Sequence, residues 1–327
     1  MGRYLARRLL WALVMMWIVA SLALLLGRLA GSDIIEQRFG IGAKKPFVEA
    51  ERHSRGLDRP LPIQYLSWLA GLARLDFGTS AYYGRPVGEL VATATRNTAL
   101  IATPAFALAV LVGLPLGLLT GSRRGVLSAA VRTLSLLLIS APPLLTSLLL
   151  VWLAALSGFA PIGGMTSSAA ATTGTGAALD LLVHLPLPVL ALALPFAAIL
   201  ERVQSEALAR ALRDPAVSAA RARGVSRRAL VWRHAWRLGA GPVVAVCGLM
   251  AGTLLSGSFA VELVTSWPGL GQLTVTAMFA RDIYLSAGCA MAATLLLSMG
   301  VVSADLIAAL IDPRVLYVDQ RSSGAAA

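Results

Sequence analysis

The sequence predicts an all-α protein that crosses a membrane six times and has both termini in the cytoplasm. Three observations lead to this prediction: the composition, six long apolar runs and the placement of the basic residues. Of the 327 residues, 57% are hydrophobic and only 13% are charged, whereas a soluble domain carries about 25% charged residues. The chain therefore has too little polar surface to cover a soluble globule of its size, and its mean hydropathy is +0.75.

Each apolar run has about the 20 residues that a helix needs to cross the hydrocarbon core of a bilayer. The first run follows three arginines, as a signal peptide would, but its apolar core is long for one, so we expect a retained helix. Prolines inside the runs are tolerated because neighbouring helices can satisfy the freed carbonyls. The six expected spans are Leu9–Leu29, Ala99–Thr120, Leu134–Leu156, Leu181–Leu200, Val243–Val264 and Ala287–Ile311.

Lysines and arginines in short loops set the orientation, since cytoplasmic loops carry an excess of them. With the N-terminus inside, nine arginines between Arg202 and Arg237 lie on the cytoplasmic side, as do Arg123, Arg124 and Arg132. The short outside loop Ser157–Asp180 carries no basic residue. Both termini are therefore expected in the cytoplasm.

The long outside loop, Gly31–Asn97, contains a segment with helical periodicity. In Leu57–Gly78, apolar residues at Ile63, Leu66, Leu69 and Leu72–Ala73 would form one stripe on a helix. We expect this helix to lie at the outer face of the membrane and to end near Asp76–Gly78. The small, polar stretch Gly163–Ala178 is typical of a flexible outside loop.

Motifs of catalysis and of nucleotide binding are missing from the sequence. It has no GxxxxGK[ST] loop for ATP, no HExxH and no GxSxG. Cys247 and Cys289 lie inside apolar runs, and we expect neither a disulfide nor a metal site. The net charge of +12 raises nucleic acid as a partner. The arginines, however, flank apolar spans and form no basic face with interleaved aromatics, so we expect no nucleic-acid binding.

The densest positive charge lies in Val217–Val243, which holds arginines, one histidine and no acid. Asp214 and Pro215 suit a helix start, with the aspartate as the cap. Gly224 suits the left-handed stop after the helix, and Ser226 can cap a second helix. The sequence thus predicts two short helices at a sharp angle, the second amphipathic with Trp232 and Trp236 on one side. Two interpretations stay open here: a loop that meets anionic lipid, or a docking helix.

The same residues resemble a known family. Ala220-Arg221-Ala222-Arg223-Gly224-Val225-Ser226, then Arg228, Arg233-His234-Ala235 and Pro242, resemble the "EAA" cytoplasmic loop of ABC importer permeases of the dipeptide/oligopeptide/nickel branch. Further landmarks follow in family order over nearly the whole chain. They are Tyr4–Leu10, Gly56–Tyr65, Asp76–Ser80, Gly84–Val87, Ser266–Gly271, Arg281-Asp282 and Asp312–Arg314. Two positions depart: Ser218 stands where the motif's glutamate is expected, and Ala30–Asp33 replaces the usual Pro-Gly-Asp-Pro.

The resemblance implies the type I ABC importer permease fold and a set of partners. These are a second, similar permease subunit, two cytoplasmic ATPase subunits that bind ATP and magnesium, and an extracytoplasmic substrate-binding protein. The chain itself would be no enzyme and would hold no cofactor. The implied organisation is residues 1–30 for the N-terminus and first span, 31–97 for the outside loop, 98–312 for the permease core with the coupling loop 201–242, and 313–327 for the cytoplasmic tail.

The resemblance also implies candidate sites. The coupling helix would contact an ATPase through Ala216, Ala219, Ala220, Arg221, Ala222, Arg223, Gly224, Val225, Arg228 and His234. Candidates for the translocation pathway or its outer gate are Glu262, Trp267, Pro268 and Gly269. Candidates for docking of the binding protein are Arg59, Gln64, Trp68 and Asp76.

The expected function is permease-mediated import of di- or oligopeptides in the inner or plasma membrane, with ATPase closure switching access through the coupling helix. Nickel chelates, haem or another small solute would suit the same architecture. A lipid-binding membrane scaffold or receptor and a secondary transporter are the alternatives from other classes. A secondary transporter should carry charges at mid-span and inverted repeats, and neither is visible.

Overall fold

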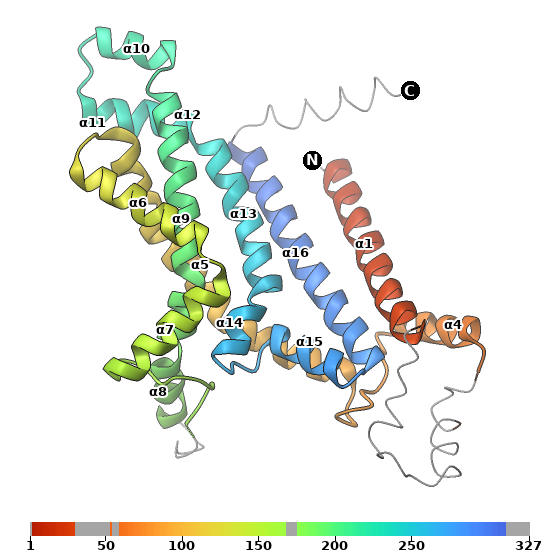
Figure 1. The fold of residues 1–327 in the computed structure, drawn as a ribbon. Helices are drawn as coiled ribbons and strands as arrows, with labels where there is room; N and C mark the ends of the chain where they lie inside the picture. Colours follow the sequence, from red (N-terminus) through yellow and green to blue (C-terminus); the bar gives the residue numbers. More distant parts are fainter. Residues whose placement is uncertain (1, 30–52, 54–58, 168–174, 312–327) are drawn as a thin grey trace. The chain divides into compact units, whose positions relative to one another are not determined.

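The computed structural model describes residues 2–29, 53, 59–167 and 175–311, and within these ranges the ordered elements are helices (Figure 1). The only pairing of extended backbone in the described part is a single antiparallel bridge between Thr79 and Pro86. The helices are α1 (Gly2–Leu29), α4 (Leu61–Leu72), α5 (Val87–Ser122), α6 (Val126–Ser140), α7 (Pro143–Ser157), α8 (Thr175–His184), α9 (Pro186–Ala211), α10 (Pro215–Ala222), α11 (Arg227–Ala229), the π-helix η1 (Leu230–Ala235), α12 (Trp236–Leu238), α13 (Ala240–Gly257), α14 (Phe259–Val264), α15 (Leu270–Phe279) and α16 (Ile283–Ile311).

Five helical segments of the described chain are long and apolar enough to cross a membrane, and a bent pair makes a sixth if it counts as one span. This confirms the expected all-α, polytopic architecture. The five are Ala6–Gly27, Val87–Ser122, Gly176–Ala211, Ala240–Val264 and Ile283–Ile307.

The third expected span, Leu134–Leu156, is not one straight helix. α6 and α7 bend by 108° at a break between Ser140 and Pro143. The cause is the proline pair: Ala141 precedes Pro142 and adopts φ −81° and ψ 125°, outside the helical region. A residue before proline is pushed towards extended backbone by the proline ring. The expected third span is therefore broken here, and it counts as one span only if α6 and α7 are taken together.

The chain forms two compact units, and each unit combines segments that are far apart in the sequence. Unit 1 contains residues 1–9, 99–267 and 296–327, and unit 2 contains residues 10–98 and 268–295. Each unit is described separately below.

Unit 1 has its core where the C-terminal part of α5, which begins this unit at Ala99, meets α9, α13 and α14. Buried side chains from these elements include Ile101, Leu192, Leu254 and Val261. Glycines at every fourth position of α5 let its backbone approach the backbone of α9 closely. A Cβ at Gly113 would lie 2.6 Å from the Ala197 carbonyl oxygen, and one at Gly117 would lie 2.5 Å from the Cβ of Gln204. Small residues spaced in this way let helices pack backbone to backbone in a membrane.

A second close contact in unit 1 joins α13 to the C-terminal part of α16. A Cβ at Gly248 would lie 1.8 Å from the Cβ of Ala304, and one at Gly300 would lie 2.4 Å from Gly252. Asp305, the residue after Ala304, forms an ion pair with Arg8 at 3.0 Å. Glycine is required at these positions because any side chain would force the two helices apart.

In unit 2, α4 packs against the part of α1 that belongs to the same unit. Trp68 is buried beside Ala20, Leu24 and Ala287, and the hydroxyls of Ser21 and Tyr65 are 2.9 Å apart. The helix expected in Leu57–Gly78 is thus confirmed, although it ends at Leu72.

The buried face of α4 is not the expected stripe. Ile63 and Leu66 are 49% and 62% exposed, whereas Gln64 and Trp68 are buried. The apolar stripe is thus the exposed side of α4, and periodicity alone does not say whether protein or lipid covers an apolar face. In a membrane protein, the exposed apolar face is the one that lipid can cover.

Candidate functional site

The first short helix expected in the basic loop is present as α10, with the predicted start and stop. Asp214 caps it by accepting a hydrogen bond from the Ala216 N–H at 2.8 Å. Gly224 follows the helix with a φ of +84°. The Gly224 N–H donates to the Arg221 carbonyl at 3.0 Å, and the Val225 N–H donates to the Ala220 carbonyl at 3.3 Å. This pair of bonds is the Schellman motif, which satisfies the last carbonyls of a helix.

α10 has one face fixed to unit 1 and one face turned to solvent. Val217 and Ala220 are 1% and 2% exposed and pack against Leu208 and Ala211 at the end of α9. The opposite face is exposed and consists of small and basic side chains. It comprises Ala216, Ser218, Ala219, Arg221, Ala222 and Arg223.

Ala220, one of the expected contact residues, is thus turned inwards. Its methyl group packs within the chain, and Val225 also packs, partly buried, against the same cluster. Both side chains therefore pack on the buried side of α10. Direct contact with a partner would fall to the exposed alanines and arginines.

The second expected helix is present, but it is longer than predicted and contains a π-helical turn. Ser226 caps α11 by accepting from the Ala229 N–H at 3.4 Å. The helical path continues through η1 and α12, with a break at Gly239 before α13. His234 lies in η1 and is partly buried. Such π-turns are often found at functional sites.

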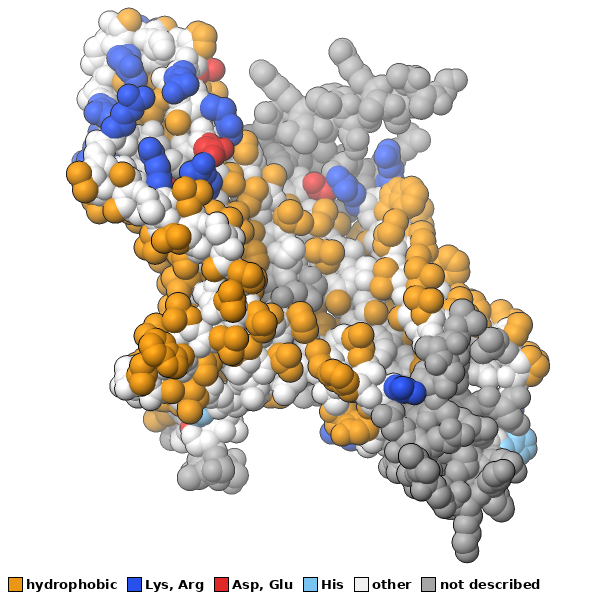
Figure 2. Space-filling model, in the orientation of Figure 1, with side chains coloured by type: hydrophobic (Ala, Val, Ile, Leu, Met, Phe, Trp, Pro, Cys, Tyr) orange, Lys and Arg blue, Asp and Glu red, His pale blue; other side chains and the backbone are white. Residues whose placement is uncertain are grey.

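Positive charge gathers on the α10–α11 end of unit 1, where Figure 2 shows basic side chains over the two helices. Arg221, Arg223 and Arg228 are exposed, and among the described residues no carboxylate lies within 4.0 Å of them. Arg227 instead donates to the Ser122 carbonyl at the end of α5. Three cations are therefore available to a partner surface.

Two pathway candidates, Glu262 and Trp267, lie inside unit 1. Both side chains are 0% exposed. The Ser258 hydroxyl donates to the Glu262 carboxylate at 2.5 Å, and the Trp267 N–H donates to the Glu262 carbonyl at 2.8 Å. In this conformation neither side chain lines an open surface of the unit.

The other two pathway candidates, Pro268 and Gly269, belong to unit 2. The Asn97 amide donates to the Pro268 carbonyl at 2.9 Å. Gly269 precedes α15, whose first N–H, from Leu270, donates to the Thr98 hydroxyl at 2.8 Å. Two polar side chains of α5, about three turns into the helix, thus hold this turn.

The docking candidates divide into exposed and buried residues. Arg59 and Asp76 are exposed, and Asp76 accepts from the Gly78 N–H at 2.9 Å. Trp68 and Gln64 are 6% and 7% exposed, and the Gln64 amide donates to the Arg59 carbonyl. Any part that these two play in docking would be indirect, through holding α4 in place.

The structure reveals a buried polar group that sequence reasoning did not connect to the loop. Glu201 and Gln204 on α9 are both 0% exposed. Thr120 of α5 hydrogen-bonds one oxygen of Glu201, and Arg132 donates to the Thr120 carbonyl. The second oxygen of Glu201 and both amide atoms of Gln204 find no partner among the described residues. Burying polar groups without partners costs free energy. The unpartnered atoms of Glu201 and Gln204 therefore destabilise the packing of α9 on α5, beside the crossing at Gly117.

A second missed feature is the carboxylate of Asp282, which organises the loop before α5 in unit 2. It is 1% exposed. It accepts from the Ser80 hydroxyl at 2.6 Å, from the Tyr82 N–H at 3.0 Å and from the Leu285 N–H at 3.1 Å. The last bond caps the start of α16. The only sequence signal was the Arg281-Asp282 pair, which does not reveal a partner 202 positions away.

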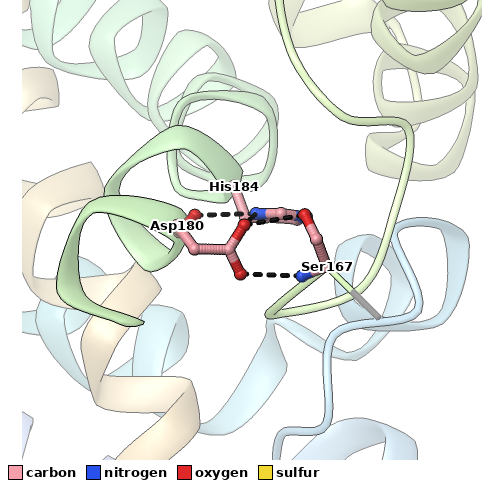
Figure 3. A network of polar contacts seen from close by, with 3 residues as sticks. All are labelled: Ser167, Asp180 and His184. Atoms are coloured by element: carbon pink, nitrogen blue, oxygen red, sulfur yellow. Dashed lines mark hydrogen bonds and ion pairs between the residues drawn. The ribbon is translucent and has the colours of Figure 1, made fainter. Parts of the chain in front are cut away.

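A serine, an aspartate and a histidine also meet at the C-terminal half of α8 (Figure 3). The Ser167 hydroxyl and N–H both donate to the Asp180 carboxylate at 2.7 Å. His184 Nδ1 lies 2.7 Å from the Asp180 carbonyl oxygen and 3.6 Å from its carboxylate. In a hydrolytic triad the histidine bonds the serine, whereas here the aspartate does. The group therefore fixes the loop end at Ser167 to α8.

The apolar spans, together with the exposed basic α10–α11 segment of unit 1, fit a polytopic membrane permease. The chain belongs to the family of binding-protein-dependent transport system inner membrane components, whose family model matches residues 113–317. The N-terminal model of the same family matches residues 1–83. The chain is thus a multi-pass protein of the inner membrane and the membrane component of a binding-protein-dependent import system.

Two relatives illustrate the similarity. The chain is 32% identical over 332 residues to the di/tripeptide transport system permease protein DppB of Pseudomonas aeruginosa, covering 96% of this chain and 98% of the relative. It is 28% identical over 325 residues to the oligopeptide transport system permease protein AppB of Bacillus subtilis, covering 97% and 100%.

Proposed function

We propose that the chain is one of two permease subunits of an ATP-driven peptide importer. A second, homologous permease completes the transmembrane pathway, and two cytoplasmic ATPase subunits bind ATP and magnesium. An extracytoplasmic binding protein delivers the peptide. The peptide substrate is supported by the names of the relatives, which are di/tripeptide and oligopeptide permeases.

The observation that carries the proposal is the two-faced structure of α10. A docking helix needs one side that binds a partner and another that transmits the partner's movement. The exposed side of α10 has small residues, such as Ala219, that permit close approach, and arginines that can pair with acidic groups. The other side packs against α9 through Val217 and Ala220.

Movement of α10 would reach the membrane through α9. The buried cluster that holds α10 includes Leu208 at the end of α9, and α9 crosses the membrane within Gly176–Ala211. Further along, α9 packs tightly on Gly117 of α5. A pull on α10 would therefore tilt α9 and α5 together, because packed cores transmit strain instead of absorbing it.

The proposed orientation has α10, α11 and both termini in the cytoplasm. It is supported by the exposed arginines at this end of unit 1, since basic residues in short loops remain inside. On the opposite side, Arg59 and Asp76 are the exposed candidates for contact with the binding protein. Glu262 and Trp267 would open to the pathway only in another conformation.

The test is to purify the chain gently from its native membrane and to identify the proteins that co-purify. The proposal predicts two ATPase subunits with P-loops, a second permease and uptake of labelled peptides after reconstitution with the binding protein. Isolation of the chain with lipid alone, without an ATPase, would favour the scaffold interpretation. Uptake of a nickel chelate or haem, with no peptide uptake, would replace the substrate but keep the importer.

A further inference from the structure

Unit 2 contains a crevice that no side chain among its described residues fills. Its volume is about 460 Å³, and three helices contribute to its walls. The walls are built largely of small side chains, with Ala23 and Gly27 from α1 and Ala290 from α16, while Thr274 and Met278 come from α15. An alanine or glycine wall cannot close such a space, so whatever surrounds the protein must fill it.

The surroundings of the crevice are those of a membrane-spanning segment near its end. α1 spans with Ala6–Gly27 and α16 spans with Ile283–Ile307, so Gly27 and Ile283 are both terminal residues of spans. Next to the crevice, Met278 and Phe279 are 66% and 80% exposed. Large apolar side chains that are exposed here favour contact with lipid over contact with water. The crevice therefore lies where acyl chains meet headgroups.

The rim of the crevice carries a positive charge, Arg281. Its side chain is exposed, and no carboxylate among the described residues lies within 4.0 Å of its guanidinium. The adjacent carboxylate, Asp282, is not available, because Ser80, Tyr82 and Leu285 already donate to it. The Ser286 hydroxyl, also at the crevice, adds a second donor.

We infer that this crevice binds one anionic phospholipid, with an acyl chain between α1 and α16 and its phosphate at Arg281. An apolar slot beside a single cation matches the two ends of such a molecule. Guanidinium groups bind phosphate oxygens with paired hydrogen bonds, and basic side chains at the membrane surface attract anionic lipids. The site goes beyond the proposed transport function, since a lipid here would hold α1 against α16 whichever solute is carried.

The test measures lipid retained by the full transporter complex in nanodiscs of phosphatidylcholine with graded phosphatidylglycerol. Native mass spectrometry counts the bound lipids. Arg281→Gln should lower phosphatidylglycerol retention about five-fold, which is the effect expected for one basic residue at the membrane surface. Arg281→Lys, which keeps the charge, should retain phosphatidylglycerol to within about two-fold of the amount that the unaltered protein retains.

A second pair of variants tests the slot itself. Ala290→Leu should fill the crevice and lower retention of both lipids, whereas Leu249→Ala, at an exposed site on α13 in unit 1, should not. Glycerol phosphate, which has the headgroup but no acyl chain, should not compete with the lipid. Equal retention in Arg281→Gln and the unaltered protein would overturn the inference. So would equal retention of the two lipids, full competition by glycerol phosphate, or a co-purifying polypeptide at this site.

Discussion

Gly117 of α5 faces Gln204 of α9 so closely that a Cβ on the glycine would lie 2.5 Å from the Cβ of the glutamine. The same helix α9 ends in the cluster that holds the coupling helix. This crossing is therefore the place where movement of the coupling helix would pass from α9 into a second transmembrane helix.

Replacing Gly117 by alanine should destabilise the complex by about 1–3 kcal/mol, because the added methyl group overpacks the crossing. The matched control is Gly241→Ala in α13, where a Cβ would meet nothing within 4 Å. There the added methyl group meets no neighbouring helix, only the ring of Pro242, which follows it in the chain, so the melting temperature should fall less than in Gly117→Ala. Thermal unfolding of both variants in nanodiscs checks this. Equal melting temperatures would show that the crossing is not tightly packed.

Removing the cap of the coupling helix should weaken transport without preventing membrane insertion. Asp214→Ala deletes the acceptor for the Ala216 N–H, and loss of an N-cap costs about 1 kcal/mol of helix stability. Peptide uptake and transport-coupled ATP hydrolysis by the reconstituted complex are the measurements. Asp214→Asn keeps an acceptor and should behave close to the unaltered protein. If alanine and asparagine were equally impaired, the charge and not the cap would matter.

The turn after the coupling helix should tolerate side-chain volume but not β-branching. A Cβ on Gly224 would meet nothing within 4 Å, yet the backbone there has a φ of +84°. Valine resists this conformation, whereas asparagine adopts it several-fold more readily than most residues. Gly224→Val should therefore abolish uptake while the protein still reaches the membrane, and Gly224→Asn should retain much of it. Unchanged uptake by the valine variant would contradict the docking-turn account.

The loop before α5 in unit 2 should depend on Asp282. Asp282→Ala would leave the Ser80 hydroxyl and two backbone N–H groups without their acceptor, and buried donors without partners cost about 1–3 kcal/mol each. The variant should expose the segment around Tyr82 to limited proteolysis. Asp76→Ala, which alters an exposed carboxylate with one backbone partner, is the control. Equal resistance to protease in both variants would show that Asp282 does not order this loop.

The local features of the coupling loop could be predicted from sequence because they depend on neighbouring residues. Asp214 lies two residues from the N–H that it accepts, and the Gly224 stop depends only on backbone preference. The apolar runs were equally visible, since span length follows from membrane thickness. The break at Pro142-Pro143 has a signal in the sequence, which is the proline pair itself. Because prolines are tolerated elsewhere in the spans, the pair alone did not predict a break.

What the sequence could not supply were contacts between distant segments. The Asp282–Ser80 bond, the Thr120–Glu201 bond and the burial of Ala220 depend on how helices pack. The buried face of α4 could not be assigned from the sequence for a related reason. In a membrane protein an apolar side chain such as Leu66 is as stable in lipid as in the core, so hydrophobicity alone does not identify the buried side.

The central claim, that the exposed face of α10 docks on an ATPase, is tested most directly by site-specific photo-crosslinking in the assembled complex. A photoreactive residue is placed at Ala219 on the exposed face of α10, and at Tyr82 in the loop of unit 2 as a control. The account predicts an adduct between position 219 and a P-loop ATPase subunit, with a yield that changes on ATP binding, and no such adduct from position 82. Adducts to lipid alone from position 219, in a complex that contains the ATPase, would contradict it.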